Sequence, residues 1–361
     1  MNQIFSTIAL ICVCMSLLFL SSCKKKDEET ESKESMTGTL LSNIPSCLYK
    51  SRTYTFTASG ITSPQGLSYK WVASSFIPDS SIVQTYSFTT PESVGDYSLS
   101  LTASFDGYNN AYKVQTITII DSLFFDCIAG IAEGEDYIED PRDGAIYHTR
   151  VYGELEWFVQ NLSWAGAGNA YSKAEALSTP FGRLYSWNEA VTGISAEIAL
   201  QSGPYDQAPA MAFNGIGAGP QGVCPPGWSV PTNEDWAHLA TVVNGGTPLS
   251  FFDPWDNIAD PLCAYAKLNG DYLWPYSPRN TKSNSAFWNG LPAGSSTNNG
   301  NNYANMGAYG FWLSSSEADA DNGYYRYIHY DVNQFPYHHT NKNTFGASIR
   351  CVRLVEAGDE G

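Results

Sequence analysis

The sequence is poor in charged residues, and most of the charges that it has are acidic. Only 15% of its 361 residues are charged, and the formal net charge is −17. Low charge together with many aromatic, Gly, Asn and Ser residues favours β structure with long polar loops over a helical bundle. A chain this acidic also repels phosphate backbones, so a nucleic-acid role is not expected. Beyond residue 126 the chain has 11 basic and 25 acidic residues, so the acidity is concentrated in the C-terminal part.

The common catalytic signatures are absent as well. There is no HExxH, no GxSxG, no P-loop and no Gly-rich dinucleotide turn. The cysteines contain no CxxC pair, which gives no support to a zinc cluster or a thioredoxin-like centre. His338 and His339 are adjacent, so in a strand their side chains point to opposite faces, and we expect them to be solvent-exposed rather than metal ligands. No catalytic residue is assigned, an enzyme is not favoured, and the metal content stays open.

What the sequence does have is an N-terminus typical of an export signal over residues 1–22. Ile8–Leu20 is an almost uninterrupted apolar run, too short for a comfortable membrane span, and the residues before it include no Lys or Arg. The run ends in Leu-Ser-Ser-Cys, which resembles a bacterial lipobox. The resemblance implies that Cys23 becomes the lipid-modified first residue; an ordinary signal peptide or a short anchor helix is the alternative.

Residues 23–38 are rich in Lys, Asp and Glu and have no apolar face, so they are predicted to form a charged tether. The acidic residues that follow Cys23 resemble the surface-export signal of lipoproteins in Bacteroidetes-type bacteria. This resemblance implies a lipid-anchored protein of the outer membrane that is exposed at the cell surface. The alternative is a charged spacer without a targeting role.

Residues 39–121 are predicted to form an all-β domain. Alternating runs such as TYTFTA (53–58) and YSLSLTA (97–103) are separated by turn residues. About seven such runs in this length fit an antiparallel β-sandwich. The segment 89–106, in which Gly-x-Tyr leads into an alternating strand, resembles PKD-like or Ig-like domains. Trp71 is expected in the core of this domain.

The C-terminal region contains an ordered series of sequence blocks. They are DGAIY with the later GELEWFVQNL, then FGRLYSW, GVCPPGWSVPTNEDW, FWLSSSE and SIRCVRL. In this order they resemble the Fibrobacter succinogenes major paralogous domain, known as FISUMP, whose family looks like a member of the C-type lectin-like superfamily. The resemblance implies that residues 127–356 form an α+β lectin-like domain with long loops, behind an Ig/PKD-like domain in a bacterial lipoprotein. It implies a fold and not a function.

The residues themselves predict two short helices in this domain, at 184–191 and 233–243. The second has Thr232 as N-cap and Asp235 at the capping-box position, and it follows a Pro-Pro-Gly turn. Strands are expected at 310–314, 324–331 and 347–354, after a long stretch rich in Gly, Asn, Ser and Pro.

Two cysteines, Cys224 and Cys351, fall in the blocks that carry the family resemblance, and a structural disulfide between them is the simpler use. In the chain-entropy model, closing so long a loop contributes on the order of 4–5 kcal/mol. Cys263 is expected to be buried packing. The partners of Cys47 and Cys127 stay open.

The sequence contains more residues suited to ligand binding than residues suited to catalysis. Aromatic, amide and hydroxyl side chains gather between residues 269 and 309. Rings against sugar C–H surfaces, with amides at the hydroxyls, are typical of saccharide recognition, and the same composition suits protein contacts. The alternative is that the tryptophans belong to the core and the loop is merely polar. The candidate ligand-binding residues are Trp274, Tyr276, Trp288, Asn289, Asn298, Asn299 and Tyr303.

Calcium-dependent sugar binding by lectin-like domains usually depends on a Glu-Pro-Asn loop and a Trp-Asn-Asp sequence. This chain has Trp288-Asn289-Gly290 and no Glu-Pro-Asn, so that mode of binding is not expected. No cofactor is predicted, although an acidic domain could hold a structural Ca²⁺.

An anchor, a spacer and a loop-rich head together predict a surface-anchored binding or adhesion protein that recognises a glycan or another surface protein. Two other classes stay open at this point. One is a structural component of a surface fibre or complex, and the other is an enzyme that acts on glycans or thiols.

Overall fold

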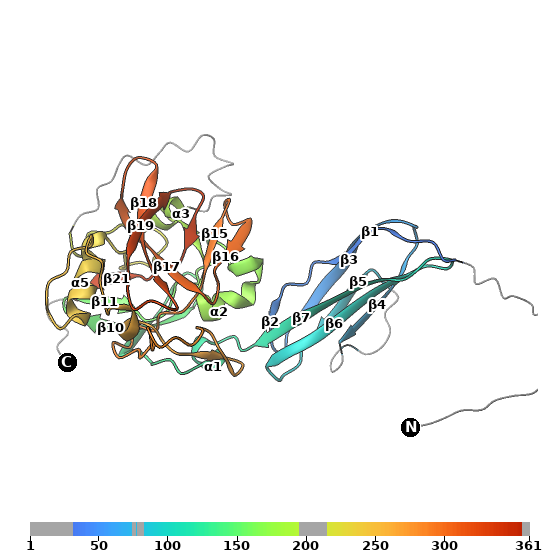
Figure 1. The fold of residues 1–361 in the computed structure, drawn as a ribbon, viewed down its shortest axis with the longest axis horizontal. Coiled ribbons are helices and arrows are strands. Elements are labelled where there is room, and N and C mark those ends of the chain that lie inside the picture. Colours follow the sequence, from blue (N-terminus) through green and yellow to red (C-terminus); the bar gives the residue numbers. More distant parts are fainter. Residues whose placement is uncertain (1–31, 74–76, 78–82, 195–214, 356–361) are drawn as a thin grey trace, which may run out of the picture.

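A computed structural model describes residues 32–73, 77, 83–194 and 215–355, and Figure 1 shows two bodies joined by a short segment. The predicted signal peptide (1–22), Cys23 and the first part of the tether lie outside the described residues. Among the helices that are described, none is both long and apolar enough to cross a membrane.

The N-terminal body is a sandwich of two β-sheets (Figure 1). The first sheet has the order β1-β3-β5, and its strands are Thr37–Ser42, Thr53–Ser63 and Thr85–Thr89. The second has the order β2-β7-β6-β4, and its strands in chain order are Cys47–Tyr49, Ser68–Ala73, Gly95–Ser104 and Ala111–Ile120. Pairing is antiparallel except between β2 and β7.

Period-two alternation explains this sandwich. In β6 the apolar Leu99, Leu101 and Ala103 are buried, and the polar residues between them face outward. Trp71 on β4 is fully buried in the same core, as predicted. The body begins earlier than expected, because β1 starts at Thr37 and Glu34 already pairs with Tyr108. The end of the predicted tether therefore belongs to the sandwich.

The C-terminal body, called the head here, is built mainly from short strands. Its sheets have the orders β21-β11-β10-β9, β12-β20-β15-β16, β14-β13-β8 and β17-β18-β19. The strands from β8 to β21 are Ile128–Ala129, Asp136–Glu139, Ile146–Tyr152, Leu155–Phe158, Tyr185–Ser186, Lys267–Leu268, Asp271–Tyr272, Ser295–Thr297, Asn302–Ala304, Tyr309–Glu317, Asn322–His329, Tyr337–Asn341, Gly346–Ala347 and Val352–Leu354.

The described helices are few and short. The α-helices α1, α2, α3, α5 and α6 are Phe124–Cys127, Ser178–Phe181, Trp187–Thr192, Asn233–Val243 and Ala259–Leu262, and the 3-10 helices η1 and η2 are Tyr171–Lys173 and Glu175–Leu177. The helix predicted at 233–243 is confirmed with its capping box between Thr232 and Asp235. The helix predicted at 184–191 is wrong at its start, because Tyr185 and Ser186 form β12 and Ser186 caps α3. The strand predicted at 347–354 is split into β20 and β21.

The predicted disulfide between Cys224 and Cys351 is confirmed. The two Cα atoms are 5.8 Å apart and 127 residues apart in the sequence. The bond ties the turn before α5 to the last strand of the head. Cys47, Cys127 and Cys263 are free and buried.

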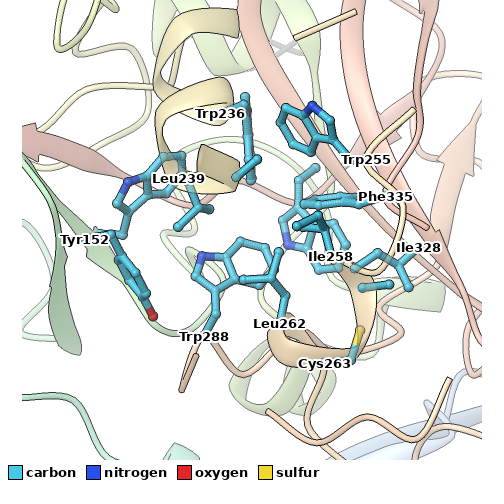
Figure 2. Packing of buried hydrophobic residues seen from close by; sticks show 14 of the residues in the cluster. Tyr152, Trp236, Leu239, Trp255, Ile258, Leu262, Cys263, Trp288, Ile328 and Phe335 are labelled. Carbon is cyan, nitrogen blue, oxygen red and sulfur yellow. The ribbon is translucent and has the colours of Figure 1, made fainter. Parts of the chain in front are cut away.

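The centre of the head is a cluster of aromatic and aliphatic side chains between α5, α6 and β17 (Figure 2). Figure 2 shows Trp236 and Leu239 of α5 near Trp288, and it shows Trp255 and Phe335 to the right of Trp236. The ring centroids of Trp236 and Trp288 are 5.9 Å apart. Rings of this size bury a large apolar area, which explains how a domain with short elements and long loops keeps a dry core.

The two bodies share an interface at one end of the sandwich. The Tyr49 hydroxyl lies 2.9 Å from the hydroxyl of Thr179, and Asn269 donates to the carbonyl of Ile119 at 3.0 Å. Lys50 and Asp121 form an ion pair, and Cys47 and Phe124 are members of one apolar cluster. Figure 1 shows that the chain enters the sandwich at the end far from the head.

Candidate functional site

Three of the predicted ligand-binding residues are core residues, and this corrects the prediction for them. Trp274, Trp288 and Asn289 are fully buried. The indole N–H of Trp274 donates to the carbonyl of Gly290 at 3.0 Å. The Asn289 amide donates to the carbonyl of Ala132 at 2.6 Å, and its oxygen accepts from the backbone N–H of Ala132 at 3.0 Å. These side chains hold the loop in place and offer nothing to a ligand.

The other predicted residues stay at the surface but are not all together. Tyr276 is 75% exposed and lines neither of the two hollows described below. Asn298 and Asn299 are exposed at the turn between β15 and β16, with φ of 52° and 53°. Asn tolerates this left-handed conformation better than most residues. Tyr303 on β16 is half-buried, with its ring centroid 5.2 Å from that of Tyr171.

Asn299 belongs to a polar crevice where β12, β20 and β15 meet. The cavity has a volume of about 10 Å³, which is room for one water-sized group. Its lining is dominated by amide, hydroxyl and carboxylate side chains and backbone, from Asn169, Leu184, Ser186, Glu189, Ser296, Asn299, Gly300, Asn343, Thr344 and Gly346. A site of this size and chemistry suits a single hydroxyl group of a larger ligand.

Two glycines allow the walls of the polar crevice to approach each other. A Cβ at Gly346 would lie 2.2 Å from the hydroxyl oxygen of Ser296, and a Cβ at Gly300 would lie 2.4 Å from the amide nitrogen of Asn169. Gly300 also has φ of 72°. Any larger residue at these positions would push the walls apart, so the shape of the crevice depends on them.

The acid in the polar crevice is Glu189, which is 7% exposed. Its carboxylate accepts from the backbone N–H of Ser186 at 2.9 Å and from that of Gly168 at 3.3 Å. The first bond is part of the capping box at the start of α3, and the negative charge is favourable at this end of a helix. Glu189 is therefore held in one position as a fixed acceptor beside the crevice.

A second feature is a row of aromatic side chains, called the aromatic face here: Tyr309, Phe311, Tyr325, Tyr327, His338 and Phe345. The rings come from all three strands of the sheet β17-β18-β19 and from the segment before β20. Phe345 stacks on Tyr325 at 5.0 Å between centroids and contacts Phe311 at 5.6 Å. Phe345 stands between the crevice residues Thr344 and Gly346 in the sequence, so one segment contributes to both the aromatic face and the crevice.

The tyrosines of the aromatic face keep hydrogen-bonding capacity. In the part of the chain that the structure describes, the hydroxyls of Tyr309, Tyr325 and Tyr327 have no hydrogen-bond partner, and the three side chains are half-buried. Burial raises the pKa of Tyr325 to about 12, so this hydroxyl stays protonated and can donate at neutral pH. The aromatic face thus offers apolar rings together with uncharged polar groups.

The described residues contain no group of three or more His, Cys, Asp or Glu side chains that could hold a metal ion. His338 and His339 are exposed on β19, as predicted, and His338 Nδ1 lies 2.7 Å from the carbonyl oxygen of His339. With one fixed carboxylate, several amides and a row of rings, the arrangement is suited to holding a neutral polyhydroxylated ligand.

Most residues of the polar crevice were not among the predicted candidates. They come from four segments that are far apart in the sequence, so no local motif could have shown them together. The Ser-Trp-Asn-Glu sequence at 186–189 did signal a helix start through Ser186 and Glu189. What it did not signal is that the capping carboxylate would also line a cavity.

The chain was compared with known proteins. A family model described as the Fibrobacter succinogenes major domain matches residues 151–353. No curated protein matches the chain. A solved structure that is similar in part is a nucleoside hydrolase-related hypothetical protein from Saccharophagus degradans that is associated with carbohydrate metabolism. The identity is 16%, with 26% of this chain and 23% of that chain covered, and the TM-score of 0.16 supports no statement about fold or function.

Proposed function

The chain belongs to the Fibrobacter succinogenes major domain family, and from this premise we propose that it binds a glycan through the polar crevice and the aromatic face, without catalysing a reaction. The single observation that carries the proposal is that one segment, with Thr344, Phe345 and Gly346, contributes to both features. A sugar ring presents an apolar C–H surface and a rim of hydroxyls, and it needs both kinds of partner at once.

The polar crevice supplies the specific part of this recognition. Its volume of about 10 Å³ admits one hydroxyl and excludes an acetamido or carboxylate group. Glu189 lines the crevice as a fixed acceptor that already binds the backbone N–H groups of Ser186 and Gly168, and Asn299 and Asn343 contribute amides that can both donate and accept. We infer that a single equatorial or primary hydroxyl of the ligand enters here.

The rings supply the larger part of the contact area. Tyr325, Tyr327 and Phe345 are half-buried, so part of each ring is available to a ligand that lies along the sheet β17-β18-β19. Rings that already pack on one another lose little side-chain entropy on binding, and this favours affinity.

The setting of the site accords with the predicted layout. We propose a lipoprotein that is anchored through Cys23 in the outer membrane and exposed at the cell surface, with an Ig/PKD-like spacer and a C-type lectin-like head. The observations behind this are the Leu-Ser-Ser-Cys sequence and the sandwich that lies between the N-terminus and the head. Protease shaving of intact cells tests the exposure: a chain that is cut only after lysis contradicts it.

The binding experiment uses the full chain on an array of glycans and polysaccharides, with and without a chelator. We expect retention of a set of neutral glycans that share one exposed hydroxyl, unchanged by the chelator because the crevice contains no metal-ligand cluster. An array that stays blank, while cross-linking on cells captures a protein partner in fixed stoichiometry, would replace this function by a structural role in a surface assembly. Turnover of a retained glycan would instead make the protein an enzyme.

A further inference from the structure

A second hollow lies away from the proposed glycan site, where the segment that leaves the sandwich crosses the head. We call it the junction cleft. Its volume is about 360 Å³, within the range of pockets that hold ligands. One wall is the segment Ser122–Asp126, which includes Leu123 and Phe125, and the opposite wall is formed by Ile146 and His148 of β10.

The wall formed by Ile146 and His148 belongs to one face of the strand pair β9-β10. His148 pairs with Tyr137 and Ile146 with Glu139, so these four side chains share a face. The ring of Phe125 packs edge-on against His148 at 4.3 Å between centroids, and the ring centroid of Tyr137 lies 6.0 Å from that of His148. Exposed Leu123 and Ile146, at 61% and 43%, leave an apolar surface at the mouth.

Several carboxylates lie around the junction cleft. Asp126 lines the cleft, and a carboxylate oxygen of Glu139 comes within 3.7 Å of the position that a Cβ would take at the lining residue Gly144. Glu133 lies near enough to His148 to act on its pKa, which burial nevertheless lowers. Among the described residues, Asp126, Glu133 and Glu139 form no ion pair.

The nearby cations are each paired with another carboxylate. Lys50, which is near enough to Asp126 to interact with its charge, pairs with Asp121. Arg150 pairs with Glu135 at 2.6 Å, and Arg142 pairs with the buried Asp140 at 2.6 Å. In the described part of the chain this apolar hollow has an acidic rim whose neighbouring cations are paired elsewhere, and such a site is complementary to a side chain that has an apolar stem and a positive head. Lysine and arginine are the amino acids with that construction.

We propose that the junction cleft binds an arginine or lysine side chain of a partner protein. The methylene stem lies against Leu123, Phe125 and Ile146, and the charged head reaches the carboxylates of Asp126 and Glu139. Charge-assisted hydrogen bonds of this kind are stronger than neutral ones, and the opposite charges also speed the encounter.

The strand β9 beside the cleft indicates that the bound arginine or lysine belongs to an extended segment of the partner. In the described sheet β21-β11-β10-β9, the strand β9 is at the edge, and its residues are mostly exposed. The N–H of Tyr137 already donates to the side chain of Asp136 at 2.7 Å. The other outer main-chain groups of β9 can pair with an added strand, which would place alternate side chains above the β9-β10 face. Binding at the junction cleft does not involve the residues of the glycan site. An experiment can therefore disprove one of the two proposals without affecting the other.

The test follows the Ile146 methyl resonance of the ¹³C-methyl-isoleucine-labelled full chain during titration with N-acetyl-L-arginine amide. We expect a saturable shift that weakens as salt is added, and at least fivefold weaker binding of N-acetyl-L-citrulline amide, the neutral isostere. The extended pentapeptide acetyl-Thr-Val-Arg-Val-Thr-amide should bind at least tenfold more tightly than the arginine amide, because it also pairs with β9.

Three variants complete the test. Asp126→Asn combined with Glu139→Gln should weaken arginine binding at least threefold, and Leu123→Ala should weaken it by removing an exposed apolar wall. Glu154→Gln changes an exposed carboxylate of the same sheet, in the turn after β10, and should leave binding unchanged. No shift of Ile146, or equal binding of the arginine and citrulline compounds, overturns the charge-based site. A pentapeptide that binds no tighter than the amide overturns the assignment to a partner segment.

Discussion

At the scale of single residues, the buried polar side chains of the head act as connectors between its loops. Arg350 is almost fully buried, and its guanidinium donates to the carbonyls of Trp288 and Asn289 at 2.6 and 2.8 Å and to the side chain of Asn161 at 2.7 Å. The oxygen of Asn161 also accepts from the indole of Trp312 at 2.9 Å. Arg350 thus fixes the loop in which the sequence analysis predicted the ligand-binding residues.

Replacing Arg350 by methionine should destabilise the protein strongly. The change keeps the apolar stem but leaves buried carbonyls without donors, and we expect a loss of about 3–5 kcal/mol in the free energy of unfolding. Arg279→Met is the control, because the side chain of Arg279 is 74% exposed, and it should change stability by less than about 0.5 kcal/mol. Chemical denaturation measures both, and equal effects would show that Arg350 is not a connector.

A second residue gives the stability of the head a dependence on pH. Asp235 caps α5, and burial raises the pKa of its carboxyl to about 6. An acid whose pKa is higher in the folded state binds more protons there, so its contribution to stability is present at low pH and is lost as the pH rises from about 4 to about 6.

The variant Asp235→Asn should remove this contribution while keeping an oxygen that accepts hydrogen bonds. As the pH rises from 4 to 7, the wild type should therefore lose about 2–3 kcal/mol more of its free energy of unfolding than the variant loses. Denaturant titrations at several pH values measure the difference. Parallel curves for the two proteins would mean that Asp235 titrates normally.

At the scale of elements, the disulfide between Cys224 and Cys351 is the connection that matters most for the frame of the head. The variant with both cysteines replaced by alanine should lose about 4–5 kcal/mol of stability in the chain-entropy model. Thermal unfolding under non-reducing conditions measures this loss. A melting temperature equal to that of the wild type would show that the bond does not constrain the unfolded chain. Alanine in place of Cys263, a buried free thiol, is the control for the loss of packing.

What the sequence predicts well at this scale is local. The capping box of α5 and the alternation in the sandwich strands are contained in a few neighbouring residues, and both are confirmed. The binding residues were predicted less well for a physical reason. Trp288 and Tyr276 have the same kind of side chain in the same loop, yet one is fully buried and the other is 75% exposed, and only tertiary packing decides between them.

The polar crevice illustrates the same limit. Asn299 was among the predicted residues because the loop is rich in Asn, whereas Glu189 and Asn343 were not. Their closeness depends on Gly346 pairing with both Ser186 and Ser296, and no spacing in the sequence shows that pairing.

At the scale of the whole molecule, the two proposed sites lie on different parts of the head. The polar crevice is formed around β12, β20 and β15, and the junction cleft lies beside α1 and β10, close to the sandwich (Figure 1). The described chain enters the sandwich at the end far from the head. A partner at the junction cleft would also contact the segment that leads from one body to the other.

The central claim, that the polar crevice binds a glycan hydroxyl, is tested most directly by a matched pair of variants in one turn. Asn298 and Asn299 share the left-handed conformation, so glycine replaces either without backbone strain, but only Asn299 lines the crevice. The measurement is the dissociation constant of each variant for a glycan retained on the array. We expect Asn299→Gly to bind about tenfold more weakly than the wild type, the cost of about one buried hydrogen bond, and Asn298→Gly to bind like the wild type. Equal affinities for the two variants would contradict the account.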